Sequence, residues 1–128
     1  MKSYLDARAK APPGENVTEN PLIMRVISYI EENYASVTSC KQIAEYFFIS
    51  QDRLSHLFKE CVGLSLWGYV ILARIQRFND LLEQGLPIEK AAYTVGFRSY
   101  TNLHRLYKKH MKISPMEYQR KHMQRSDE

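Results

Sequence analysis

The chain has 128 residues, of which 45% are hydrophobic and 25% charged, and a net charge of +4. This length can bury one sizeable core without metal or disulfide support, so we expect one domain. Two cysteines, Cys40 and Cys61, are too few for a secreted disulfide framework, and we expect both to be reduced and buried. No apolar run has the length of a membrane span and the start has no signal-peptide pattern, which excludes membrane and secreted classes and predicts a cytoplasmic protein.

Residues 1–19 contain a Pro-Pro-Gly run and no sustained periodicity, so we expect a flexible tail or an interdomain linker. Asn20-Pro21 is typical of a helix cap followed by proline in the first turn. Apolar residues then recur at helical spacing and predict a first helix that ends near Tyr34. We expect the folded domain to cover residues 20–123, with a short tail at 124–128.

Further helices follow in close succession. A short helix near Ser39 precedes a helix that Ser50 can cap, and together they form a unit at about 39–60. A long apolar pattern predicts a connector helix at about 66–84, which Gly85 ends. Three more helices are expected near 88–95, 100–110 and 115–123. Because no segment alternates with the period of a strand, we predict an all-α fold of about seven helices.

An internal repeat relates residues 48–69 to residues 97–118 at a constant offset of 49 positions. The identical pairs are Phe48/Phe97, Ser50/Ser99, Leu54/Leu103, Leu57/Leu106, Lys59/Lys108, Ser65/Ser114 and Tyr69/Tyr118. Upstream, Ala44 and Ala92 are 48 apart, so one unit has an extra residue in its turn. The repeat predicts two helix-turn-helix subdomains, the second at about 88–110.

Charge is concentrated in the second half of the repeat. The segment 98–125 has eight Lys or Arg and one acid, a net charge of +7, which leaves −3 for the remainder. Such a segment is either a solvated face or the binding surface for an anionic partner. The connector helix would span about 28 Å at about 1.5 Å per residue. This approaches the ~34 Å between successive major-groove faces of DNA, so one chain could reach two of them.

These features resemble the DNA-binding domain of AraC/XylS-type transcription regulators over about residues 22–122. The resemblance is carried by Ala92-x-x-Val95-Gly96-Phe97-x-Ser99, Leu103-x-Arg105-x-Tyr107-Lys108, Ile113-Ser114-Pro115-x-x-Tyr118, Ile43-Ala44, Ser50, Leu54-x-x-Leu57-Phe58-Lys59 and Gly63-x-Ser65. Lys112 departs from the pattern, in which glycine is usual. The resemblance implies two helix-turn-helix units joined by a long helix, and a regulator, often an activator, that binds promoter DNA and can contact RNA polymerase. It also implies an effector-sensing or dimerisation domain that many members carry, and an association with the bacterial nucleoid.

The DNA-binding residues that we predict lie in the second helix of each unit. In the second unit, the resemblance places base reading on Thr101, Asn102 and Arg105. Arginine suits a bidentate contact with guanine, and Asn102 either reads adenine or supports the helix start. Asp52 either accepts from cytosine or complements the helix dipole, and His56 is a donor or a surface histidine. The full predicted set is Gln51, Asp52, Arg53, Ser55, His56, Lys59, Tyr100, Thr101, Asn102, Arg105, Lys108 and Lys109.

Other chemistry is not expected. Cys40, Cys61 and the histidines lack the paired short spacing of zinc sites, so we predict no metal and no cofactor. Asp52, Ser55 and His56 diverge on a helix without an oxyanion hole, so we predict no enzyme. Two alternatives to sequence-specific binding stay open: a helical protein-interaction module with a solvated basic surface, and a non-specific nucleic-acid binder with a steep salt dependence.

Overall fold

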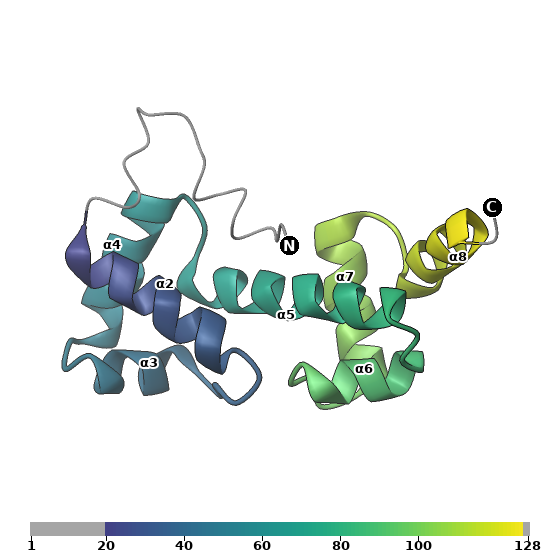
Figure 1. Cartoon of the computed structure of the whole chain (residues 1–128). Coiled ribbons are helices and arrows are strands. Elements are labelled where there is room, and N and C mark those ends of the chain that lie inside the picture. Colours follow the sequence, from purple (N-terminus) through teal and green to yellow (C-terminus); the bar gives the residue numbers. More distant parts are fainter. Residues whose placement is uncertain (1–19, 127–128) are drawn as a thin grey trace. The chain divides into compact units, whose positions relative to one another are not determined.

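The computed structural model describes residues 20–126, with side chains up to His122. In this part of the chain every regular element is a helix (Figure 1). The helices are α2 (Pro21–Asn33), α3 (Cys40–Tyr46), α4 (Gln51–Val62), α5 (Leu66–Glu83), α6 (Ile88–Thr94), α7 (Tyr100–Met111) and α8 (Pro115–Ser126). The predicted all-α class and the number of helices are therefore confirmed.

Helix boundaries follow local capping signals and agree with the predictions within one or two residues for α2 to α7. Asn20 caps α2 by accepting a hydrogen bond from the N–H of Ile23 at 3.1 Å. Ser39 caps α3 by accepting one from the N–H of Gln42, also at 3.1 Å. The last helix is longer than expected, because α8 continues to Ser126 through part of the segment predicted as a tail. The predicted tail or linker at residues 1–19 lies outside the described residues.

The chain forms two compact units, which divide within α5 between Ala73 and Arg74. The first unit contains α2, α3, α4 and the beginning of α5. Its core is assembled from the inward faces of these helices, and the fully buried side chains include Ile23, Ile30, Ile43, Leu54 and Phe58. Phe58 meets Tyr69 edge to face, with ring centroids 5.4 Å apart.

The second unit contains the remainder of α5 together with α6, α7 and α8. Tyr107 of α7 is fully buried and packs edge to face against Phe78 of α5, with centroids 5.6 Å apart. Its hydroxyl donates to Oδ1 of Asn79 over 2.6 Å, so the polar end of this buried ring is satisfied. Tyr118 of α8 packs beside Tyr107 and donates to the carboxylate of Glu83, which connects α8 to the end of α5.

The turns before α4 and α7 follow an alignment different from the one that the sequence suggested. In the first turn, Phe48 donates to the carbonyl of Glu45 and Ile49 to that of Ala44; in the second, Gly96 donates to Tyr93 and Phe97 to Ala92. Phe48 is thus equivalent to Gly96, and both have a positive φ, of 56° and 106°. The predicted match of Phe48 with Phe97 is wrong: Phe48 is 96% exposed, whereas Phe97 is 3% exposed.

Ile49 therefore takes the place of Phe97. The extra residue of the second turn is Arg98, which lies between the buried Phe97 and the cap of α7. The expected burial of the cysteines also needs correction. Cys40 and Cys61 are free thiols, but both are half-buried rather than buried.

Candidate nucleic-acid interface

The second helix of each unit begins with the same serine cap. Oγ of Ser50 accepts from the N–H of Arg53 at 3.2 Å, and Oγ of Ser99 accepts from the N–H of Asn102 at 3.1 Å. Each cap uses the third N–H of its helix and leaves the first two without an intrahelical partner. The positive end of each helix therefore has donors suited to a phosphate oxygen.

On α7, one side is anchored and the opposite side is exposed. Leu103 and Tyr107 are fully buried, while Leu106 is half-buried. With 3.6 residues per turn, the position farthest from these anchors is that of Arg105. The exposed stripe centred on it consists of Thr101, Arg105, Lys108 and Lys109, with Asn102 half-buried at its edge. It carries three fixed positive charges and no acid.

The corresponding stripe on α4 has the same geometry and a different charge. Leu54 and Phe58 are its buried anchors, and His56 occupies the outermost position, 49 residues before Arg105. The exposed side chains around His56 are Asp52, Arg53, Lys59 and Glu60. The charges of these two acids and two bases cancel, so together they give this face no net charge.

Three predicted site residues lie off the centres of these stripes. Tyr100 is half-buried, and its hydroxyl is enclosed without a hydrogen-bond partner among the described residues, so this group is not presented at the surface. Burial, followed by the nearby Glu89, raises the pKa of the Tyr100 phenol. Ser55 is half-buried on the flank of α4, and Gln51 is exposed in its first turn. The remaining nine predicted residues lie on the two stripes.

The prediction also omitted two exposed charges beside the stripes. Glu60 stands where α7 has Lys109, and it makes the first face less basic. The helical period of α4 places Glu60 next to His56 and could have revealed it. Arg98 is exposed directly before the cap of α7, but its position became evident only when the turn hydrogen bonds located the inserted residue.

The end of α7 adds further positive charge to the second unit. The helix ends at Lys112, which has a φ of 69°, as α4 ends at Gly63 with a φ of 90°. Burial, then the charges of Lys109 and Lys112, lowers the pKa of His110. His110 is thus held neutral around physiological pH, and the charge of this region comes from its lysines and arginine.

Within the described part of the chain, no group of three or more His, Cys, Asp or Glu side chains is arranged to hold a metal ion. None of the described helices combines the length and apolar character that crossing a membrane requires.

Comparison with known proteins agrees with this architecture. The helix-turn-helix domain family matches residues 43–121, and hence more than half of the chain. An uncharacterized HTH-type transcriptional regulator of Escherichia coli (strain K12), YijO, is 31% identical over 102 residues, which are 79% of this chain and 36% of that protein. The multiple antibiotic resistance protein MarA of the same organism is 29% identical over 108 residues, covering 84% of this chain and 85% of MarA.

Solved structures give the same result. A transcriptional regulator from Chromobacterium violaceum, described as an AraC-type DNA-binding domain-containing protein, superposes with a TM-score of 0.76 at 28% identity. The match covers 84% of this chain and 96% of that one. The chain spans about a third of the length of YijO and of the melibiose operon regulatory protein. The repeated capped units and these matches together establish that the chain belongs to the AraC-type helix-turn-helix domain family.

Proposed function

We propose that this chain binds double-stranded promoter DNA and regulates transcription as an activator, with α4 and α7 as the helices that enter the major groove. The observation that carries the proposal is the exposed stripe of α7. Leu103 and Tyr107 anchor this helix to the core, and Thr101, Arg105 and Lys108 lie on its opposite, solvent-facing side. An anchored helix with a polar outer face can present side chains to base edges without losing its packing. Membership of the AraC-type family supports the same role.

Within this proposal the contacts divide by chemistry. Arg105 reads guanine through a bidentate contact, and Asn102 and Thr101 contact bases beside it. Lys108 and Lys109 neutralise phosphates, and the free N–H groups at the starts of α4 and α7 donate hydrogen bonds to phosphate oxygens. In the first unit His56 is the reading residue, flanked by Asp52, Arg53 and Lys59. We leave Tyr100 out of the contact set, because its hydroxyl is enclosed.

The wider setting is also part of the proposal. We propose that the two units occupy two adjacent major-groove segments, that RNA polymerase and an effector-sensing domain are protein partners, and that the chain acts in the cytoplasm at the nucleoid. No catalytic role is assigned. Relatives that are more than twice as long as this chain motivate the sensing partner.

Selection of bound sites from random DNA, followed by footprinting on the selected site, tests the proposal. We expect protection of two adjacent major-groove segments. Arg105→Ala should weaken binding about tenfold or more and relax the preference at one base pair, since a bidentate contact discriminates by about 1–3 kcal/mol. His56→Ala should relax preference in the other segment. Arg120→Ala is the matched control, because Arg120 is an exposed arginine outside both stripes.

The alternatives give different results. A protein-interaction module would select no DNA sequence and protect none. A non-specific nucleic-acid binder would bind with a steep salt dependence but without a preferred site, and Arg105→Ala and Arg120→Ala would then weaken it equally.

A further inference from the structure

The outward face of α2 is not used by the proposed DNA contacts. Ile23, Val26 and Ile30 point into the core of the first unit and are fully buried. On the opposite side, Arg25, Ser28 and Glu32 are all exposed. At 3.6 residues per turn these three positions fall along one stripe of the helix.

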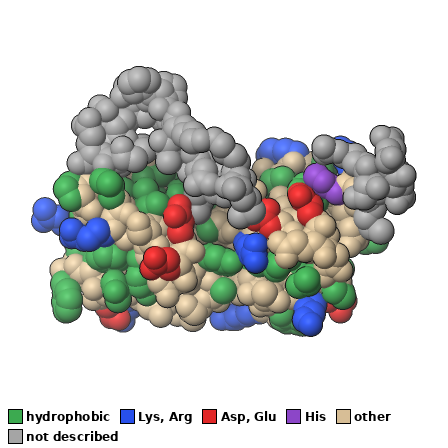
Figure 2. All heavy atoms as spheres, in the orientation of Figure 1, with side chains coloured by type: hydrophobic (Ala, Val, Ile, Leu, Met, Phe, Trp, Pro, Cys, Tyr) green, Lys and Arg blue, Asp and Glu red, His purple; other side chains and the backbone are tan. Residues whose placement is uncertain are grey.

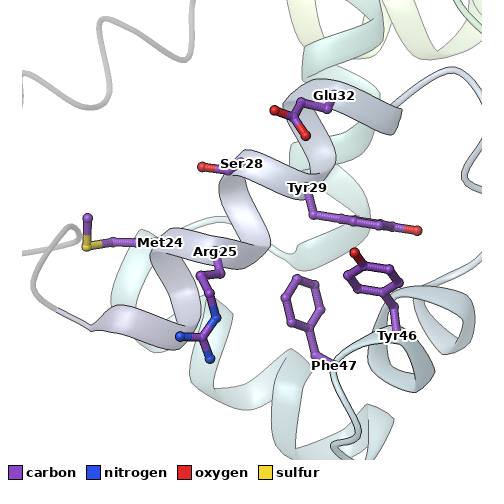
Figure 3. A pocket seen from close by; sticks show the side chains of 7 residues that line it. All are labelled: Met24, Arg25, Ser28, Tyr29, Glu32, Tyr46 and Phe47. Carbon is purple, nitrogen blue, oxygen red and sulfur yellow. The ribbon is translucent and has the colours of Figure 1, made fainter.

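This stripe borders an open groove of about 520 Å³ between α2 and α3, shown in Figure 3. Three aromatic rings form its floor and side: the centroid of Tyr29 lies 4.3 Å from that of Tyr46 and 5.6 Å from that of Phe47. Two large apolar side chains at its rim stay accessible, Tyr46 at 60% and Met24 at 45%. Exposed apolar residues that line one groove together with charged side chains are typical of an interaction surface.

The charges of the stripe are arranged with opposite signs at its two ends. Figure 2 shows basic side chains over the beginning of α2 and acidic side chains over its end. Arg25 and Glu32 are seven residues apart, so they lie about 10 Å apart along the helix, too far to pair with each other. Among the side chains described, up to His122, no ion pair involves either of them.

We propose that this face binds the same face of a second copy of the chain, with the two α2 helices antiparallel about a two-fold axis near Ser28. A two-fold axis places residue i of one copy against residue j of the other and j against i. Arg25 of each copy then faces Glu32 of the other, so both pairs of opposite charges form. A parallel arrangement in register would instead bring like charges together.

Packing on the stripe is compatible with such a helix pair. Ser28 is the small residue at the crossing, where two helices approach to about 8–10 Å between their axes. Met24 lies one turn before this crossing and can be covered by the second copy, while Tyr46 lines the α3 side of the groove against Tyr29 (Figure 3). One helix pair buries less surface than the roughly 1,200–2,000 Å² of a stable complex, so we expect a weak dimer that forms at high local concentration.

Sedimentation velocity of the full chain without DNA, from about 1 µM to about 1 mM, tests this pairing, since weak complexes dissociate in that range. We expect a saturable monomer–dimer equilibrium. Arg25→Glu and Glu32→Arg should each weaken dimerisation about tenfold or more, because symmetry makes every reversal act twice. Lys41→Glu is the matched control: it reverses an exposed charge on α3 that does not line the groove and should leave the equilibrium unchanged.

Variants that restore the pairing of opposite charges give the most specific test. The double variant Arg25→Glu/Glu32→Arg should regain dimerisation, and an equimolar mixture of the two single variants should form a heterodimer that is stronger than either homodimer. A chain that stays monomeric at every concentration overturns the proposal. So does a dimer that the single reversals leave intact. A strict monomer whose thermal stability the reversals alter would mean that another segment of the same chain covers the groove, which also excludes self-pairing.

The readout is independent of the proposed function, because association is measured without DNA. Failure of dimerisation would leave the selected-site binding and its dependence on Arg105 untouched. Failure to bind any DNA site would leave the monomer–dimer equilibrium measurable.

Discussion

The two helix-turn-helix units share a backbone plan but differ in the faces that they present. In both, a serine caps the second helix and a residue with positive φ ends it, at positions separated by 49 residues. The exposed stripe of α4 has no net charge, with Asp52 and Glu60 offsetting its bases, whereas that of α7 carries three positive charges. Capping and anchoring thus constrain the inward half of each helix and leave the outward half free to diverge.

The buried aromatic residues that anchor α4 and α7 also differ, because one of them has a hydroxyl group. In the first unit Phe58 packs against Tyr69, and in the second Tyr107 packs against Tyr118 at the equivalent positions. Tyr107 adds a buried hydroxyl, which is satisfied by Asn79. The second unit therefore combines a basic outer face with a buried hydrogen bond between Tyr107 and Asn79, whereas the outer face of the first unit has no net charge. The difference suggests that the second unit supplies most of the affinity for DNA under the proposed function.

The largest expected effect concerns the buried hydroxyl. Tyr107→Phe leaves Oδ1 of Asn79 without its donor in the core of the second unit and should lower the free energy of unfolding by about 1–3 kcal/mol. Denaturant unfolding measures this loss. The control is Tyr118→Phe, which removes a hydroxyl from an exposed hydrogen bond with Glu83, where water can replace it. Equal losses for both variants would show that burial does not increase the contribution of the Tyr107–Asn79 hydrogen bond to stability.

Exchanging charge between the two faces should shift DNA affinity in opposite directions. Lys109→Glu should weaken binding to the selected site about tenfold, and Glu60→Lys at the equivalent position of α4 should strengthen it by a similar factor. The slope of affinity against salt concentration should become shallower for the first variant and steeper for the second. If both changes alter affinity in the same direction, the charge difference between the faces does not determine binding.

The two turns should respond differently to a change of side chain. Gly96 has a φ of 106°, which L residues rarely adopt, so Gly96→Ala should destabilise the second unit by about 1–2 kcal/mol. Phe48→Gly should change stability by less than about 0.5 kcal/mol, because relief of strain is offset by the greater freedom of glycine in the unfolded chain. The melting temperatures of the two variants, each compared with that of the unchanged chain, measure these effects. A large stabilisation by Phe48→Gly would mean that strain in the first turn exceeds this expectation.

The smallest effect is a pH dependence confined to the second unit. Burial, Lys109 and Lys112 hold the pKa of His110 below its ordinary value, so the unfolded chain binds this proton more readily than the folded one. As the pH falls below about 6.5, the second unit should lose stability, by less than about 1 kcal/mol. The variant His110→Gln should flatten this decline in unfolding curves between pH 7 and 5. The equivalent residue of the first unit is Cys61, so this histidine has no counterpart there.

Much of the candidate site was predictable from the sequence, because its helices are encoded locally. Serine caps and apolar residues at helical spacing act within one or two turns, so the boundaries of α4 and α7 and the exposed position of Arg105 could be derived from the repeat. The assignment of DNA contacts to individual residues stays a prediction. Tyr100 shows why sequence position alone is insufficient: it precedes the exposed stripe directly, yet its hydroxyl is enclosed.

The sequence by itself determined that the chain is helical and that it contains two capped units 49 residues apart, since these properties depend on neighbouring residues. Tertiary structure decided which turn residues are equivalent. Ile49 donates a hydrogen bond to Ala44 as Phe97 does to Ala92, so Ile49 and Phe97 occupy equivalent positions. The inserted Arg98 hides this equivalence in the sequence. It also decided the pairing of Tyr107 with Asn79, which are 28 residues apart in the chain. Such contacts depend on how whole helices pack together, and a local pattern carries no record of that packing.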